Sequence, residues 1–114
     1  MHELSIAEQI VDIAREYSER ENVTSVREIE LEIGTLSGIE IDALTFALDV
    51  VTKQTVLDGA KVTIIDVPAA ARCEACGAEF LLEDYFAPCT ECGEFRNTPI
   101  RGQELRVKSL IVNE

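Results

Sequence analysis

The sequence is poor in the residues that most often carry catalysis and nucleic-acid binding. Its 114 residues include one histidine, one methionine and no tryptophan, and aromatic residues make up only 5%. Basic residues number 10 against 22 acidic residues, which gives a formal net charge of -12. Such a charge repels nucleic acid and anionic membranes and favours cations or basic protein surfaces. We therefore expect neither nucleic acid nor a membrane as a partner.

Long apolar runs are also absent, since none approaches the roughly 18–20 residues that a membrane helix needs. The first ten residues, M-H-E-L-S-I-A-E-Q-I, lack the basic and apolar regions of a secretion signal. These absences predict a cytoplasmic protein whose cysteines stay reduced. Hydrophobic residues still make up 46% of the chain, which is enough for a packed core.

Cysteine is the residue type that the sequence does concentrate. All four cysteines form two C-x-x-C pairs with twelve residues between the pairs, namely Cys73, Cys76, Cys89 and Cys92. A glycine follows each pair and can adopt the positive φ that closes a tight turn. Two such turns facing each other supply four thiolates to one tetrahedral ion, so the spacing predicts a structural zinc site.

Other uses of four cysteines are less compatible with this pattern. Two disulfides would need an oxidising compartment. A redox-active dithiol usually begins a helix, which the glycine after each pair disfavours. Iron held by four thiolates remains chemically possible. A site with four protein ligands has no open position, so we interpret it as structural and not catalytic.

Hydrophobic periodicity outlines the regular elements on either side of the cysteine segment. It predicts a first helix over residues 4–20 with the stripe Leu4, Ala7, Val11 and Ala14, and a second helix from Ile41 to about residues 52–54. Ser5 and Ser37, each three residues before a glutamate, are candidate helix caps. Strands are predicted over residues 26–33, 61–67 and 104–112, whereas residues 96–102 are expected to form a loop.

The element order predicts an α+β fold with two helices packed on a small three-stranded mixed sheet and an inserted four-cysteine zinc-ribbon subdomain. The strand–helix–strand unit favours parallel pairing through a right-handed crossover. We expect one domain from residues 1–70 and 103–114, and a zinc-ribbon domain from residues 71–102. The residues expected to be buried under the helices are Ile29, Leu31, Ile33, Val62, Ile64, Leu105 and Val107. Those expected to form a small cluster in the ribbon are Phe80, Leu81, Leu82, Tyr85 and Phe86.

The N-terminus offers a second, different metal site. His2 is the only histidine, and a lone histidine is seldom a ligand, but its position is suggestive. The α-amine of Met1, the backbone nitrogen of His2 and the His2 imidazole can chelate one ion. A fourth donor can come from the backbone nitrogen or the carboxylate of Glu3. A planar, nitrogen-rich set of this kind suits nickel(II) or copper(II) better than zinc or magnesium.

Three motifs together resemble the HypA/HybF family of hydrogenase nickel-insertion accessory proteins. They are M-H-E-L-S-I-A at the start, G-T-L-S-G-I-E in the middle, and C-E-A-C-G with C-T-E-C-G later in the chain. The resemblance implies a nickel metallochaperone that delivers Ni(II) to the large subunit of nickel–iron hydrogenase together with a nickel-binding GTPase. Some relatives also serve urease maturation proteins.

The resemblance also implies roles for individual residues. Nickel would be bound by Met1, His2 and Glu3, and zinc by the four cysteines. The segment between the two cysteine pairs contains no histidine, so a role described for histidines near the zinc of some relatives does not carry over.

Two further functions compete with the nickel chaperone. One is a zinc-ribbon module that only bridges proteins, and the other is a rubredoxin-like electron carrier with iron in the four thiolates. No nucleophile–base pair is recognisable, because the sequence has no histidine besides His2. We therefore do not expect an enzyme.

Overall fold

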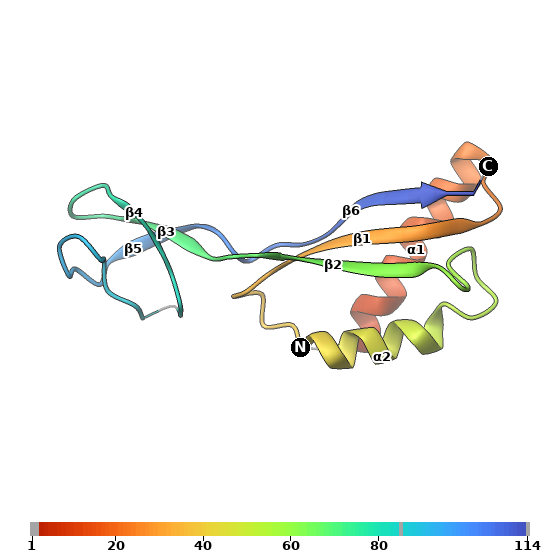
Figure 1. Cartoon of the computed structure of the whole chain (residues 1–114), viewed down its shortest axis with the longest axis horizontal. Coiled ribbons are helices and arrows are strands. Elements are labelled where there is room, and N and C mark those ends of the chain that lie inside the picture. Colours follow the sequence, from red (N-terminus) through yellow and green to blue (C-terminus); the bar gives the residue numbers. More distant parts are fainter. Residues whose placement is uncertain (1–2, 85, 114) are drawn as a thin grey trace. The chain divides into compact units, whose positions relative to one another are not determined.

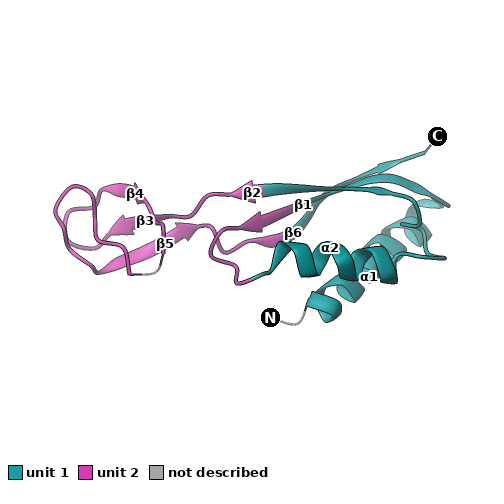
Figure 2. Ribbon diagram, turned by 60° about the horizontal axis from the view of Figure 1, so that its bottom comes forward, with its two compact units in different colours: residues 1–31, 39–65, 106–114 teal, residues 32–38, 66–105 magenta. Residues whose placement is uncertain are grey.

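The computed structural model describes residues 3–84 and 86–113. The described elements follow in the order α1 (Glu3–Glu21), β1 (Val26–Gly34), α2 (Ile41–Val51), β2 (Lys61–Val67), β3 (Ala70–Cys73), β4 (Glu79–Leu81), β5 (Asn97–Arg101) and β6 (Leu105–Val112) (Figure 1). The strands form two three-stranded sheets with the orders β2-β1-β6 and β4-β3-β5. Unit 1 comprises residues 1–31, 39–65 and 106–114, and unit 2 comprises residues 32–38 and 66–105 (Figure 2).

The predicted fold class is confirmed. Both predicted helices and all three predicted strands are present, with bounds within a few residues of those expected. The first sheet is mixed: Figure 1 shows β1 and β2 running in the same direction and β6 in the opposite one. The predicted division into domains at residues 70–71 and 102–103 stays a prediction.

The core of unit 1 lies between the two helices and the central strand β1. Ile29 and Leu31 of β1 are fully buried, and the glutamates that alternate with them are only half-buried, as their alternation predicted. The helices contribute Ile6, Ala7, Ile10, Val11, Ala14, Leu44, Ala47 and Leu48. Leu4 was predicted in the buried stripe, but it is 54% exposed because it lies at the margin of the buried arc of α1.

The prediction for the edge strands was wrong in part. Thr63 of β2 donates a hydrogen bond to Glu28, and Ser109 of β6 donates one to Glu30. Side chains that bond across adjacent strands share a face, so Val107 lies on the glutamate face together with Ser109. Leu105 is two residues before Val107, so it lies on the same face of β6, and it is 37% exposed instead of buried.

Sequence alone could not decide the orientation of β6. Both alternating sets of this strand contain apolar residues, so its pattern fits either face. Residues of both sets, Leu110 as well as Val107 and Ser109, border a groove with Ile13 and Tyr17 of α1, since β6 lies at the edge of the sheet. Val62 and Ile64 of β2 are half-buried rather than buried, since β2 lies at the edge of the sheet.

Neither Ser5 nor Ser37 is at the N-cap position that the sequence predicted. Ser5 lies inside α1, which begins at Glu3. The N-cap of α2 is Glu40, which has no side-chain capping bond of its own. The backbone N–H of Glu40 instead donates to Oε2 of Glu3 at 3.1 Å. A carboxylate thus satisfies the amide at the start of α2, where the positive end of the helix dipole favours it.

Unit 2 contains a sheet whose third strand was not expected. β3 pairs with β4 and with β5, antiparallel in both cases. Residues 96–102 were predicted as a loop because of Pro99 and Gly102, but Asn97–Arg101 forms β5. β5 lies at the edge of its sheet, where the missing N–H of proline costs no ladder bond.

Candidate metal centre

Each cysteine pair is held by the same backbone turn. In the first, Gly77 N–H donates to the Cys73 carbonyl at 3.0 Å, and Cys73 N–H donates to the Ala78 carbonyl at 2.8 Å. β3 ends at Cys73, and the chain returns at Glu79 as β4, so the turn is the tip of a hairpin. Gly77 has φ of 76°, a left-handed conformation that the turn requires and that glycine adopts without strain.

The second turn repeats the first. Gly93 N–H donates to the Cys89 carbonyl at 2.9 Å, and Cys89 N–H donates to the Glu94 carbonyl at 2.9 Å. Gly93 has φ of 79°. The backbone N–H of Glu91 lies 3.4 Å from the Cys89 sulfur, so it can donate to a thiolate there. The two C-x-x-C-G sequences therefore form one type of knuckle twice, as their spacing predicted.

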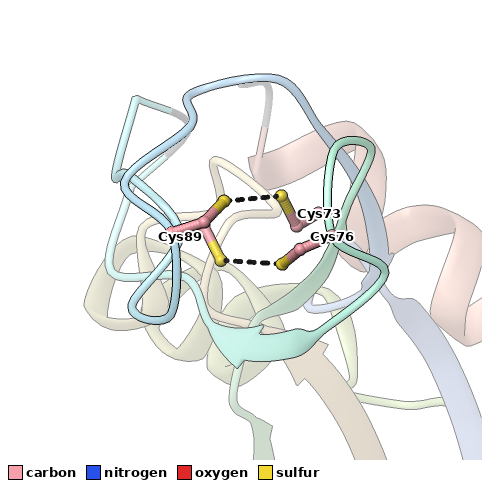
Figure 3. Close-up of side chains that lie close together, drawn as sticks. Cys73, Cys76 and Cys89 are labelled. Atoms are coloured by element: carbon pink, nitrogen blue, oxygen red, sulfur yellow. Dashed lines mark hydrogen bonds between the residues drawn. The ribbon is translucent and has the colours of Figure 1, made fainter.

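The four sulfurs of Cys73, Cys76, Cys89 and Cys92 all lie within 4.8 Å of one another. Figure 3 shows Cys73, Cys76 and Cys89 with their side chains directed toward a common centre. The sulfur–sulfur distances are 3.6 Å for Cys73–Cys92 and 3.7 Å for Cys76–Cys89, and all four thiols are free. A tetrahedron with zinc–sulfur bonds of about 2.3 Å has edges of roughly 3.8 Å. The sulfur cluster thus has the dimensions of a four-thiolate zinc site.

The electrostatics of the cluster favour a cation at its centre. The backbone N–H groups of Cys76 and Ala75 lower the pKa of Cys73 to about 7, against the opposing effect of burial. The backbone N–H of Glu94 also acts to lower the pKa of Cys92, but the crowded sulfurs, with that of Cys73 foremost, raise it to about 12. One thiol therefore ionises readily, whereas further ionisation is opposed by the charge already present. A divalent cation among the sulfurs offsets the repulsion between the thiolate charges, so that all four thiols can ionise.

A small apolar cluster surrounds the sulfurs. Its buried members are Ala69, Ala71, Cys73, Phe80, Leu82 and Cys89, and Leu36, Ala78 and Ala87 pack against it. Burial of Phe80 and Leu82 confirms part of the predicted ribbon cluster. Leu81 and Phe86, which were also predicted there, are 66% and 84% exposed, and Tyr85 lies outside the described residues.

The loop containing G-T-L-S-G also belongs to unit 2, a relation that its sequence did not reveal. Ala69 N–H donates to the Thr35 hydroxyl at 3.1 Å, and Leu36 N–H donates to the Gly102 carbonyl at 2.7 Å. A Cβ atom on Gly34 would lie 2.0 Å from the Gly102 carbonyl, so this position excludes every larger residue. The close backbone approach gives the glycine a physical role beyond that of a turn.

The proposed nickel site is placed only in part. Met1 and His2 lie outside the described residues. Glu3, the first residue of α1, is half-buried, and its carboxylate accepts the bond from Glu40 described above. The sequence suggested Glu40 only as the partner of Ser37 in a cap. Its amide instead holds the side chain of a predicted nickel residue, and no sequence pattern links positions 3 and 40.

Comparison with known proteins identifies the family. A family profile described as "Hydrogenase/urease nickel incorporation, metallochaperone, hypA" matches residues 1–112. The chain belongs to the HypA family. A hydrogenase maturation factor HypA from Geotalea uraniireducens is 45% identical over 112 residues, which cover 98% of this chain and 99% of that one. One from Chlorobium phaeobacteroides is 38% identical with the same coverage.

Solved structures of HypA proteins have the same fold. The solution structure of the Ni metallochaperone HypA from Helicobacter pylori matches with a TM-score of 0.71 at 20% identity, covering 98% of this chain and 97% of that one. A second HypA solution structure gives a TM-score of 0.74 at 22% identity, with coverage of 99% and 97%. The family resemblance derived from the three sequence motifs is therefore confirmed. Within the described residues, no helix is long and apolar enough to cross a membrane.

Proposed function

We propose that this HypA-family chain is a nickel metallochaperone that delivers Ni(II) to the large subunit of nickel–iron hydrogenase during maturation. A nickel-binding GTPase is the expected partner in that delivery, and urease maturation proteins are a further class of partner. The protein carries the ion and hands it over without catalysing a reaction. Since its function needs reduced thiols, we place it in the cytoplasm.

Nickel would be held at the N-terminus by the Met1 amine, the backbone nitrogen and imidazole of His2, and a donor from Glu3. The match of residues 1–112 to a nickel-incorporation family supports this assignment. The bond from Glu40 N–H to the Glu3 carboxylate bears on the choice of the fourth donor. Because that carboxylate already accepts a backbone hydrogen bond, the backbone nitrogen of Glu3 is the better candidate for the fourth donor. We assign nickel binding to the domain of residues 1–70 and 103–114.

The zinc ligands would be Cys73, Cys76, Cys89 and Cys92, in the zinc-ribbon domain of residues 71–102. Their sulfur–sulfur distances of 3.6 and 3.7 Å support this assignment. Zinc in such a site has no open position, so its contribution is to hold the two knuckles together. Iron in the same site would give a coloured protein, and visible absorption distinguishes the two metals.

Isothermal titration with nickel tests the proposed function. We expect one tight site in the native protein and none in His2→Ala, which lacks the imidazole, or in a protein with residues added before Met1, which lacks the terminal amine. Binding should weaken as the pH falls, because the amine, imidazole and amide donors must all lose protons.

Two controls accompany this titration. Zinc content and thermal stability should stay unchanged in both variants, which shows that only the N-terminal site was removed. Glu3→Gln should lower nickel affinity only mildly if the backbone nitrogen is the donor. If the extended protein binds nickel as tightly as the native one, the N-terminal site is wrong and a protein-bridging zinc ribbon becomes the better account.

A further inference from the structure

Strand β6 forms one edge of the sheet in unit 1. In the order β2-β1-β6 it pairs with β1 on one side only, so within the described part of the chain the backbone groups on its other side have no strand partner. β6 is 8 residues long, which exceeds the usual length of a strand. A free edge of this length is a surface on which another extended segment can form ladder hydrogen bonds.

An open groove of about 330 Å³ lies between this edge and α1. Its apolar side chains are Ile13 and Tyr17 of α1 and Val107 and Leu110 of β6. Ile13 is 48% exposed, so much of its side chain remains available for contact. All residues of the groove belong to unit 1, and none is part of the sulfur cluster or of the N-terminal tripeptide. The groove therefore has no role in holding either proposed metal ion.

The groove carries more positive than negative charge. Its charged residues are Glu16, Arg20 and Lys108. The guanidinium of Arg20 lies over the ring of Tyr17, 5.6 Å from its centroid, and neither base forms an ion pair with a described residue. In a chain with 22 acidic and 10 basic residues, this local excess of bases favours a carboxylate on whatever binds here.

The same charges disfavour a second copy of this chain on the free edge. Arg106, Lys108 and Leu110 alternate along β6, so their side chains share one face. Antiparallel pairing of two β6 edges would bring the bases of both copies close together, and like charges across a strand pair are destabilising. A segment with an acidic residue has the complementary charge.

We propose that β6 binds an extended segment of a partner protein as an additional strand, and that this segment carries apolar and acidic side chains on its α1 side. An apolar side chain contacts Ile13 and Leu110 in the groove. A carboxylate two residues away pairs with Lys108 or Arg20, since alternate residues of a strand share a face. The ladder bonds supply affinity, and the groove selects the sequence.

A model peptide tests this proposal on the full-length, nickel-free protein. We would titrate the acetylated and amidated peptide TVTETVT, which places valines and one glutamate on one face, and follow the amide signals by NMR. Saturable shifts should appear in β6 and at Ile13. The β6 amides directed away from β1 should exchange with solvent more slowly, because they then donate to the added strand. Absence of saturable shifts in β6 would overturn the proposal.

N-methylated peptides distinguish strand addition from simple occupation of the groove. Only alternate N–H groups of an added strand face β6, and the others face solvent. Methylating the nitrogens of one alternating set should abolish binding, whereas methylating those of the other set should leave it nearly unchanged. Equal affinity of the two methylated peptides would contradict the formation of ladder bonds.

A charge exchange tests the predicted acidic residue. Lys108→Glu should weaken binding of TVTETVT about fivefold and strengthen binding of TVTKTVT by a similar factor, because it reverses the charge beside the peptide. Lys53→Glu makes the same change in net charge at an exposed position outside the groove, and it should bind both peptides as the native protein does. Equal affinity of the native protein for both peptides would refute the selection of an acidic segment.

A second pair of variants tests the apolar contact. Ile13→Asn should weaken binding of TVTETVT about fivefold, since it removes an apolar side chain from the groove. Leu4→Asn is the matched control, because Leu4 is 54% exposed on the same helix and lies outside the groove. Thermal unfolding of both variants separates lost binding from lost folding. Association of the protein with itself through β6, seen as shifts that depend on protein concentration and resist the peptide, would assign the edge to a second copy and overturn the proposal.

Discussion

Units 1 and 2 fill their interiors with different kinds of side chain. In the described part of unit 1, the fully buried large residues are aliphatic, with Ile29, Leu31, Leu44 and Leu48 among them. In unit 2, the buried cluster around the sulfurs consists of two alanines, two cysteines, Phe80 and Leu82. Unit 1 thus has the interior of an ordinary small domain, whereas unit 2 has too few large apolar residues for its size.

The difference shows how a short chain can combine two sources of stability. Burial of aliphatic side chains stabilises unit 1 in proportion to the area removed from water. If the four cysteines hold zinc as proposed, bonds from the thiolates to the ion stabilise unit 2, because small domains with little apolar core generally need such a link. We therefore expect the two units to respond independently to the loss of metal and to core truncation.

The largest expected effect is loss of the metal from unit 2. Cys76→Ser or Cys89→Ser should abolish zinc binding and unfold residues near 72–96, because a four-thiolate site contributes on the order of 10 kcal/mol or more to folding. Helix content, which lies entirely in unit 1, should largely remain. Elemental analysis measures the zinc, and amide hydrogen exchange locates the unfolded segment.

A suitable control for the Cys76→Ser and Cys89→Ser variants is Glu91→Gln. It changes an exposed residue inside the second knuckle, and the protein should keep one zinc per chain. Stoichiometric iron in the native protein would contradict the zinc assignment. Loss of the helices together with the metal would contradict the independence of the two units.

An intermediate effect is expected from truncating the core of unit 1. Leu31 is 0% exposed, so Leu31→Ala should lower the free energy of unfolding by about 2–5 kcal/mol through lost burial and the cavity left behind. Leu4→Ala makes the same chemical change at a site that is 54% exposed and should cost less than about 1 kcal/mol.

Urea unfolding followed by helix circular dichroism reports these values for unit 1. Both variants should retain one zinc per chain. Equal destabilisation by the two substitutions would show that burial in unit 1 differs from that described.

The smallest expected effect concerns the link between the N-terminus and α2. Glu3→Ala removes the acceptor of the Glu40 N–H and should destabilise unit 1 by about 1 kcal/mol, as loss of a helix-capping acceptor does. Glu3→Gln keeps an oxygen acceptor and should cost less. Thermal unfolding of both variants, with Glu8→Gln as the exposed control on the same helix, measures the difference, and no change in Glu3→Ala would refute the capping role.

The sequence predicted correctly those features that depend on a short stretch of neighbouring residues. The spacing of the four cysteines and the glycine after each pair predicted two knuckles, because each knuckle depends on five consecutive residues. The presence of two such knuckles in one short segment predicted that their sulfurs would meet, and the four sulfurs do lie together. Strand β1 was predicted with the correct buried face, since only one of its alternating sets is apolar. The family was recognisable because its three motifs lie along nearly the whole chain.

The tertiary structure decided what depends on residues far apart in the chain. Apolar residues occupy both faces of β6, so the sequence does not show which face is directed at the helices. The hydrogen bond from Ser109 to Glu30 shows it. The cap of α2 comes from Glu3, thirty-seven positions earlier, in place of the nearby Ser37. In both cases more than one local arrangement fits the sequence, and a contact with a distant segment selects one of them.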